Sequence, residues 1–187
     1  MTITLHTVGH SGRSLDELLE LLRSAGIRTV VDVRQPSELS HAQHFSQEGV
    51  REALSAAGVD YHCAGRQLGG LRQARPASPH RALTDAGLRG YADYMGTEMF
   101  KKAAAQLMHL GSLAATTILC VERDPMACQR SLLADYLVLQ GVVVTHLLDT
   151  VPGQVDTVPG QAHLLRPEVR RESAELIYDR VVSATPV

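Results

Sequence analysis

The sequence has no tryptophan and only two phenylalanines among its 187 residues, so its core must be built mainly from aliphatic side chains. It also lacks any apolar run long enough to span a membrane. Its first residues, MTITLHTVGHS, read as a strand and do not follow the pattern of a signal peptide. We therefore expect a cytoplasmic protein that does not bind membranes.

The charge and the cysteine content argue against three further classes of protein: general nucleic-acid binders, disulfide-rich proteins and zinc proteins. Eighteen Lys and Arg residues against 20 Asp and Glu residues give a net charge of -2, so no global field attracts nucleic acid. Nucleic-acid binding would need a local basic patch. The three cysteines, Cys63, Cys120 and Cys128, fit neither a disulfide framework nor a zinc-binding spacing.

Apolar runs and helical patterns alternate along the chain. Strands are expected near 3–9, 28–33, 59–63, 116–121 and 142–148. Ser14 and Glu17 form a capping box for the first helix, and Thr97 is expected to cap a later one. The pattern predicts a single three-layer α/β domain over 1–187, with a mostly parallel sheet of about five strands flanked by helices. Residues 64–87 form an irregular excursion rich in Arg and Gly, and 151–187 form a C-terminal extension that packs on the domain.

The stretch 116–137, TTILCVERDPMACQRSLLADYL, is the most informative part of the chain. It predicts a buried strand, a short polar loop and a helix that Asp124 caps, with Pro125 at the first helical position. Ligands of parallel sheets bind at the carboxyl ends of strands and beside helix N-termini. The sequence therefore predicts a site at this turn.

Two carboxylates lie at the ends of apolar strands and are candidates for general acid/base catalysis. Asp32 lies inside the buried run VVDV, and Arg34 falls on the same side of the pleat. The two form either a structural ion pair or a ligand clamp. Glu122 ends the next apolar run, and it is either a catalytic acid or a capping partner for its own loop.

Three other side chains fall at the same predicted edge. Arg130, close to the helix N-terminus, predicts a site for phosphate or carboxylate, against the alternative of a surface salt bridge. His10, between Gly9 and Gly12, is either a structural histidine or a catalytic one. Cys128 suggests a thiol enzyme as a third reading, whereas Cys120 reads as an inert core thiol.

Several motifs together resemble a known family. They are TVGHSGRSLDELLELLRSAGI, VVDVR, GVDY with LGGLR, GYADYMGTEMF, LCVERDPMACQRSLLADYL with GVVVTHLL, and finally the segment at His163 and Leu164. In this order they resemble a family of bacterial and archaeal proteins catalogued as domain of unknown function 488. The resemblance implies a compact α/β domain whose motif residues gather at one sheet edge. The implied site consists of His10, Ser11, Asp32, Arg34, Gly69, Gly70, Tyr94, Glu122, Cys128 and Arg130. This chain has Gln129 where the family commonly has a histidine.

The leading hypothesis is an enzyme that acts on a phosphate-bearing substrate, either a nucleotide or a nucleic acid. Asp32 or Glu122 would act as acid or base with help from His10, while Arg34 and Arg130 hold the anion. The alternative is a non-catalytic module that binds an anion or docks a partner, and a homo-oligomer is possible. No cofactor or metal is expected, since Glu38, His41 and His44 read as solvated loop residues.

Overall fold

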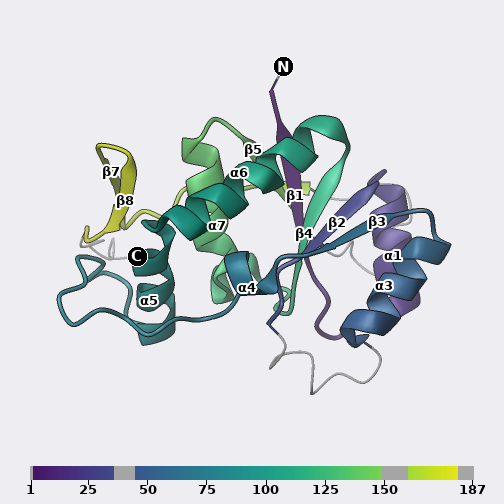
Figure 1. Cartoon of the computed structure of the whole chain (residues 1–187), viewed down its shortest axis with the longest axis horizontal. Coiled ribbons are helices and arrows are strands. Elements are labelled where there is room, and N and C mark those ends of the chain that lie inside the picture. Colours follow the sequence, from purple (N-terminus) through teal and green to yellow (C-terminus); the bar gives the residue numbers. More distant parts are fainter. Residues whose placement is uncertain (1, 36–44, 149–159, 181–187) are drawn as a thin grey trace, which may run out of the picture.

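A six-stranded sheet forms the centre of the molecule (Figure 1). The computed structural model describes residues 2–35, 45–148 and 160–180. The strand order is β3-β2-β4-β1-β5-β6. The parallel strands are β1 (Thr4–Gly9), β2 (Thr29–Asp32), β3 (Asp60–Cys63), β4 (Thr116–Cys120) and β5 (Val143–Leu147), and β6 (Gly160–Ala162) runs antiparallel to β5. The α/β class and the mostly parallel sheet are thus confirmed, with β6 as an additional strand that is too short to leave a sequence pattern.

Helices cover both faces of the sheet. Apolar side chains of α1 (Leu15–Ser24) and α3 (Gln47–Ala56) pack with Val8, Val30 and Leu119 on one face. The helices α5 (Ala86–Met95), α6 (Glu98–Leu113) and α7 (Arg130–Leu139) pack with Leu5, Val31, Ile118 and Val144 on the other. The two sets of strand residues alternate along each strand, as the pleat requires.

The helix caps follow the sequence signals with one correction. Ser14 and Glu17 form the expected capping box, and Thr97 caps α6. Asp124, however, caps only a single 3-10 turn over Pro125–Ala127. Cys128 then adopts an extended conformation with φ -138° and ψ 154°, so α7 begins afresh at Arg130. The prediction of one continuous helix starting behind Asp124 was therefore wrong.

Residues 64–87 contain only the short helix α4 (Gly65–Leu68) before α5 begins, and the rest is irregular as expected. Further along the chain, β7 (Val169–Glu172) and β8 (Glu175–Tyr178) form an antiparallel hairpin. Figure 1 shows this hairpin beside α5, at the end of the molecule opposite α1 and α3. Among the described residues, no helix has the length and apolar character needed to cross a membrane.

Candidate functional site

The residues that the sequence placed at one site lie on opposite faces of the sheet. Asp32 alternates with Val31, so its side chain lies on the face that α1 and α3 cover. Cys120 and Cys128 belong to the core beneath α5, α6 and α7. The strands β2 and β4 are neighbours, as the sequence argument assumed, and Asp32 pairs in register with Leu119. The structure thus brings these residues to one edge of the sheet but distributes them over two faces.

Asp32 and Arg34 form a buried ion pair. Asp32 accepts hydrogen bonds from Nε of Arg34 at 2.9 Å, from Nη2 at 2.7 Å and from its backbone N–H at 3.0 Å. The Tyr61 hydroxyl donates a fourth bond at 2.7 Å, and Nη1 of Arg34 donates to the Phe45 carbonyl. Both side chains are almost fully buried, with exposed fractions of 1% and 2%. Of the two alternatives for this pair, these contacts favour the structural one.

His10 stacks on Phe45 beside this pair, with ring centroids 4.4 Å apart. Burial and the neighbouring Arg34 cation lower the pKa of His10 to about 4, so the ring is neutral at pH 7. Its Nε2 is buried and has no hydrogen-bond partner among the described residues. His10 is therefore placed as a packed, neutral ring next to Asp32 and Arg34.

Arg130 is buried under the turn that follows β4. Its Nη2 donates to the backbone carbonyls of Glu122 at 2.8 Å and Arg123 at 3.2 Å, which fixes the turn. Its Nε and Nη1 are buried without a hydrogen-bond partner among the described residues. The Glu122 side chain is exposed and lines a cavity of about 140 Å³ together with Cys120, Cys128 and Gln129.

The remaining residues implied by the family resemblance make close backbone contacts. A Cβ on Gly69 would lie 1.6 Å from the Val33 carbonyl oxygen, and Gly70 has a positive φ of 77°. The Tyr94 hydroxyl donates to the Gln67 carbonyl at 2.9 Å, and the Arg72 guanidinium lies over the Tyr94 ring at 4.4 Å. Ser11 is exposed, and its backbone N–H donates to Val121.

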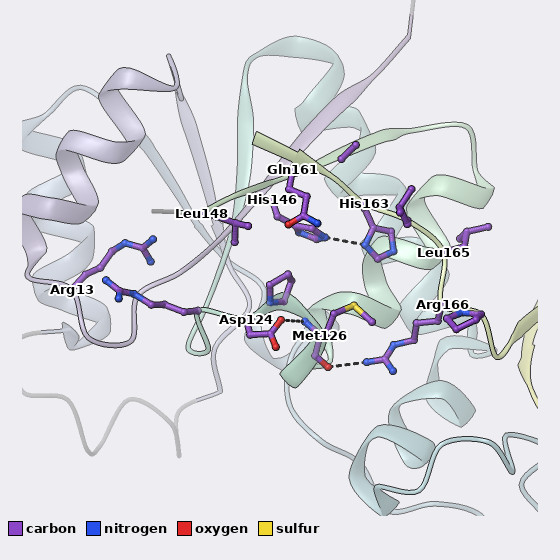
Figure 2. A pocket seen from close by; sticks show the side chains of 14 residues that line it. Arg13, Asp124, Met126, His146, Leu148, Gln161, His163, Leu165 and Arg166 are labelled. Carbon is purple, nitrogen blue, oxygen red and sulfur yellow. Dashed lines mark hydrogen bonds between the residues drawn. The ribbon is translucent and has the colours of Figure 1, made fainter. Parts of the chain in front are cut away.

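A larger cavity lies elsewhere, at the carboxyl ends of β1, β4 and β5 (Figure 2). We call it the arginine pocket; its volume is about 700 Å³. Figure 2 shows Arg13 at one side, Arg166 at the other, and His146 and His163 between them. The connections after β1 and β4 leave in opposite directions along the sheet, which makes this the crevice where α/β proteins bind ligands.

A chain of hydrogen bonds holds the wall of the arginine pocket. Thr7 Oγ1 lies 2.7 Å from Nδ1 of His146, whose Nε2 lies 2.9 Å from Nδ1 of His163. Nε2 of His163 lies 2.9 Å from Oδ1 of Asp135, which is fully buried. Asp135 also accepts hydrogen bonds from the Tyr178 hydroxyl at 3.0 Å and from the Arg166 backbone N–H at 3.0 Å.

The direction of the first two hydrogen bonds in this chain depends on the tautomers of the two histidines. Burial, helped by the charges of His163 and Arg130, lowers the pKa of His146 to about 4, so His146 is neutral at pH 7. With a neutral His163, every donor points toward Asp135: Thr7 O–H to His146, His146 Nε2–H to His163, and His163 Nε2–H to the carboxylate. A proton added to His163 would reverse the first two bonds. With or without this proton, each ring nitrogen of His146 and His163 forms a hydrogen bond within the protein.

The other pocket residues combine cations with apolar surface. Arg13, Arg123 and Arg166 come from the β1–α1 turn, the β4–α7 turn and the segment after β6. Among the described residues, Asp124 is the only carboxylate in the lining. Nη2 of Arg166 donates to the Met126 carbonyl, in the 3-10 turn, and to Ser131, in the first turn of α7. Apolar residues that are otherwise exposed complete the lining: Met126 (42%), Leu164 (78%) and Leu165 (39%).

A family model described as the domain of unknown function DUF488 matches residues 14–137. The chain belongs to the DUF488 family. No curated protein and no solved structure matches it. The family match includes Asp135 and ends before His146, His163 and Arg166, so the arginine pocket of this DUF488 protein is built partly from residues beyond the matched region.

The described part of this DUF488 protein contains no group of three or more His, Cys, Asp or Glu side chains that could hold a metal ion. Glu38, His41 and His44 lie outside the described residues. The arginine pocket was missed because its residues are far apart in sequence. One signal could have found it. His146 is a polar residue inside the apolar strand VVVTHLL, just as Asp32 is a polar residue inside the apolar strand VVDV.

Proposed function

We propose that this DUF488 protein binds a phosphate-bearing small molecule of about nucleotide size in the arginine pocket. The observation that carries the proposal is that three arginines, from three separate segments, line one cavity, whose described lining contains a single carboxylate. Guanidinium groups form strong, charge-assisted hydrogen bonds to phosphate. The volume of about 700 Å³ falls within the usual range for small-molecule sites.

The apolar part of the lining supports a ligand that is more than inorganic phosphate. Met126, Leu164 and Leu165 expose large apolar side chains to solvent, and all three lie at this pocket. Exposed apolar surface of this kind is typical of binding sites. A nucleotide would place its phosphate on the arginines and its base on these side chains.

Binding, without turnover, is the function that the contacts support best. Both oxygens of Asp32 accept hydrogen bonds from Arg34, Tyr61 or both. Each ring nitrogen of His146 and His163 is likewise engaged within the protein. A general acid or base must reach the ligand's proton. Carboxylate chemistry on the bound compound, the leading hypothesis from the sequence, therefore stays a prediction.

Calorimetric titration tests the proposal with inorganic phosphate, AMP and ATP as probes. Arg123→Ala removes an exposed pocket arginine and should weaken nucleotide binding about 10-fold or more, since a charged hydrogen bond contributes about 1.5–3 kcal/mol. Leu164→Ala should weaken AMP binding but leave phosphate binding unchanged. Arg51→Ala, an exposed arginine on α3, is the matched control.

Equal affinities in the wild type and in Arg123→Ala, or no heat with any phosphate compound, would refute the proposal. Chromatography of the titrated ATP and AMP tests turnover in the same samples. Conversion of either compound by the wild type would restore the enzyme hypothesis.

A further inference from the structure

Cys120 and Cys128 form a close pair of thiols behind the turn that follows β4. Their sulfur atoms lie 2.9 Å apart, although the residues are eight positions apart in sequence and no disulfide joins them. Both are almost completely buried, at 1% and 4% exposed. A disulfide needs a separation of about 2.05 Å, so only a small displacement separates this pair from a covalent bond.

The hydrogen bonds around the pair hold both sulfurs in place. The Gln129 side chain bridges them, with its Nε2 donating to Cys120 at 3.4 Å and its Oε1 accepting from Cys128 at 3.3 Å. The backbone N–H of Arg130 donates to the Cys128 sulfur at 3.4 Å. Gln129 thus serves the reduced thiol pair as donor and acceptor at once.

The charge distribution distinguishes the two cysteines. Cys128 precedes the ten-residue helix α7 and receives one of its first backbone N–H groups, which favours a thiolate. The hydrogen bond to Cys128 and burial raise the pKa of the Cys120 thiol, whereas the Arg130 cation opposes them. Arg130 itself is 1% exposed, and among the described residues its guanidinium donates to backbone carbonyls and to no carboxylate. A negative charge on the sulfur pair would compensate this buried cation.

A small cavity gives access to the pair. It has a volume of about 140 Å³ and is lined by both cysteines, Gln129 and the exposed Glu122. Because a water molecule takes about 30 Å³ of liquid volume, hydrogen peroxide fits this space and a bulky disulfide such as a tripeptide dimer does not.

We propose that Cys128 and Cys120 are a dithiol–disulfide couple that hydrogen peroxide oxidises, with Cys128 as the attacking thiol and Cys120 as the resolving one. This inference uses none of the residues that line the arginine pocket and does not rest on the proposed ligand. It assigns chemistry to Cys120, which the sequence alone presents as an inert core residue.

The reaction has two steps. The Cys128 thiolate, having lost its proton to solvent through the cavity, attacks one peroxide oxygen; the O–O bond breaks and hydroxide leaves, taking up a proton to become water. The Cys120 sulfur then attacks the sulfenic acid at Cys128, the S–S bond forms, and the hydroxyl leaves with the Cys120 proton as a second water. Two thiols lose two electrons and one peroxide becomes two waters. An external dithiol reverses the oxidation.

Mass spectrometry of the whole chain after treatment with one equivalent of hydrogen peroxide tests the proposal. Oxidation should remove two hydrogen atoms from the intact mass, and dithiothreitol should restore them. Tryptic cleavage separates Cys120, in 103–123, from Cys128, in 124–130, so the disulfide appears as these two peptides linked together. Cys63, exposed on β3 and lying in 52–66, is an internal control for a thiol outside the pair.

Variants test the order of the steps in the presence of dimedone, which traps sulfenic acid. Cys120→Ser should accumulate the adduct at Cys128, Cys128→Ser should give no adduct at Cys120, and Cys63→Ser should behave as the wild type. Circular dichroism checks that each variant is folded. The wild-type peptide result does not depend on the variants.

Two results would overturn the proposal. One is wild-type protein in which Cys63 is oxidised while the peptides 103–123 and 124–130 remain unlinked. The other, which would reverse the assigned roles, is a dimedone adduct at Cys120 in Cys128→Ser as strong as that at Cys128 in Cys120→Ser.

Discussion

Replacing Asp32 by Asn separates a structural role of this carboxylate from a catalytic one. The substitution keeps the shape of the side chain but removes the charge that compensates Arg34. Asp32 accepts three hydrogen bonds from Arg34 and one from Tyr61, and the two ionic side chains are 1% and 2% exposed. Breaking a buried ion pair from one side costs about 3–5 kcal/mol, because a buried charge is left without its partner.

We therefore expect Asp32→Asn to lower the free energy of unfolding by about 3–5 kcal/mol, a large part of the roughly 5–15 kcal/mol of a typical domain. For a chain of this size the melting temperature should fall by about 6–20 °C. Urea titration followed by circular dichroism measures the change. Asp60→Asn, the same substitution at an exposed position on β3, should stay within about 0.5 kcal/mol of the wild type.

A variant whose stability stays within about 1 kcal/mol of the wild type would refute this reasoning. If Asp32→Asn kept its stability and lost an activity found in the wild type, the catalytic role considered from the sequence would replace the structural one.

Three further predictions concern β1, the buried histidines and α1. Gly9→Ala would place a Cβ 1.8 Å from the Glu122 carbonyl oxygen and should cost more than about 2 kcal/mol, measured by urea unfolding. Burial lowers the pKa of His10 and His146 to about 4, below the usual 6.5, so between these pH values the unfolded chain binds more protons than the folded one. The contribution of these histidines to the free energy of unfolding should be fully present above pH 6.5 and be lost as the pH falls toward 4. Replacing both by Gln should flatten this pH profile. Ser14→Ala removes the α1 cap and should cost about 1 kcal/mol by thermal unfolding.

Local signals in the sequence predicted much of the fold. The capping box at Ser14 and the cap at Thr97 depend only on neighbouring residues, and both are present. The two-residue period of a strand correctly placed Arg34 beside Asp32. The start of α7 could not be predicted, because the sequence does not reveal that Cys128 is extended where it packs against Cys120.

The arginine pocket depends on contacts that have no local signal. His146 and His163 are 17 residues apart, and His163 and Asp135 are 28 apart. No helical or strand period connects positions at such separations, and β6, which brings His163 to the sheet, has only three residues. The sequence placed its candidate residues at the carboxyl ends of the strands, but which polar side chains meet there is decided by how distant segments pack.

The wall of the arginine pocket joins the family-matched stretch to a later part of the chain. The family-matched stretch supplies the buried acceptor, Asp135. Its three partners, which are His163, the Arg166 backbone N–H and the Tyr178 hydroxyl, belong to the part of the chain beyond that match. Buried polar contacts of this kind fix one docking position. Replacing the segment after β6 would therefore change the lining of the arginine pocket, while the five parallel strands lie outside the replaced segment.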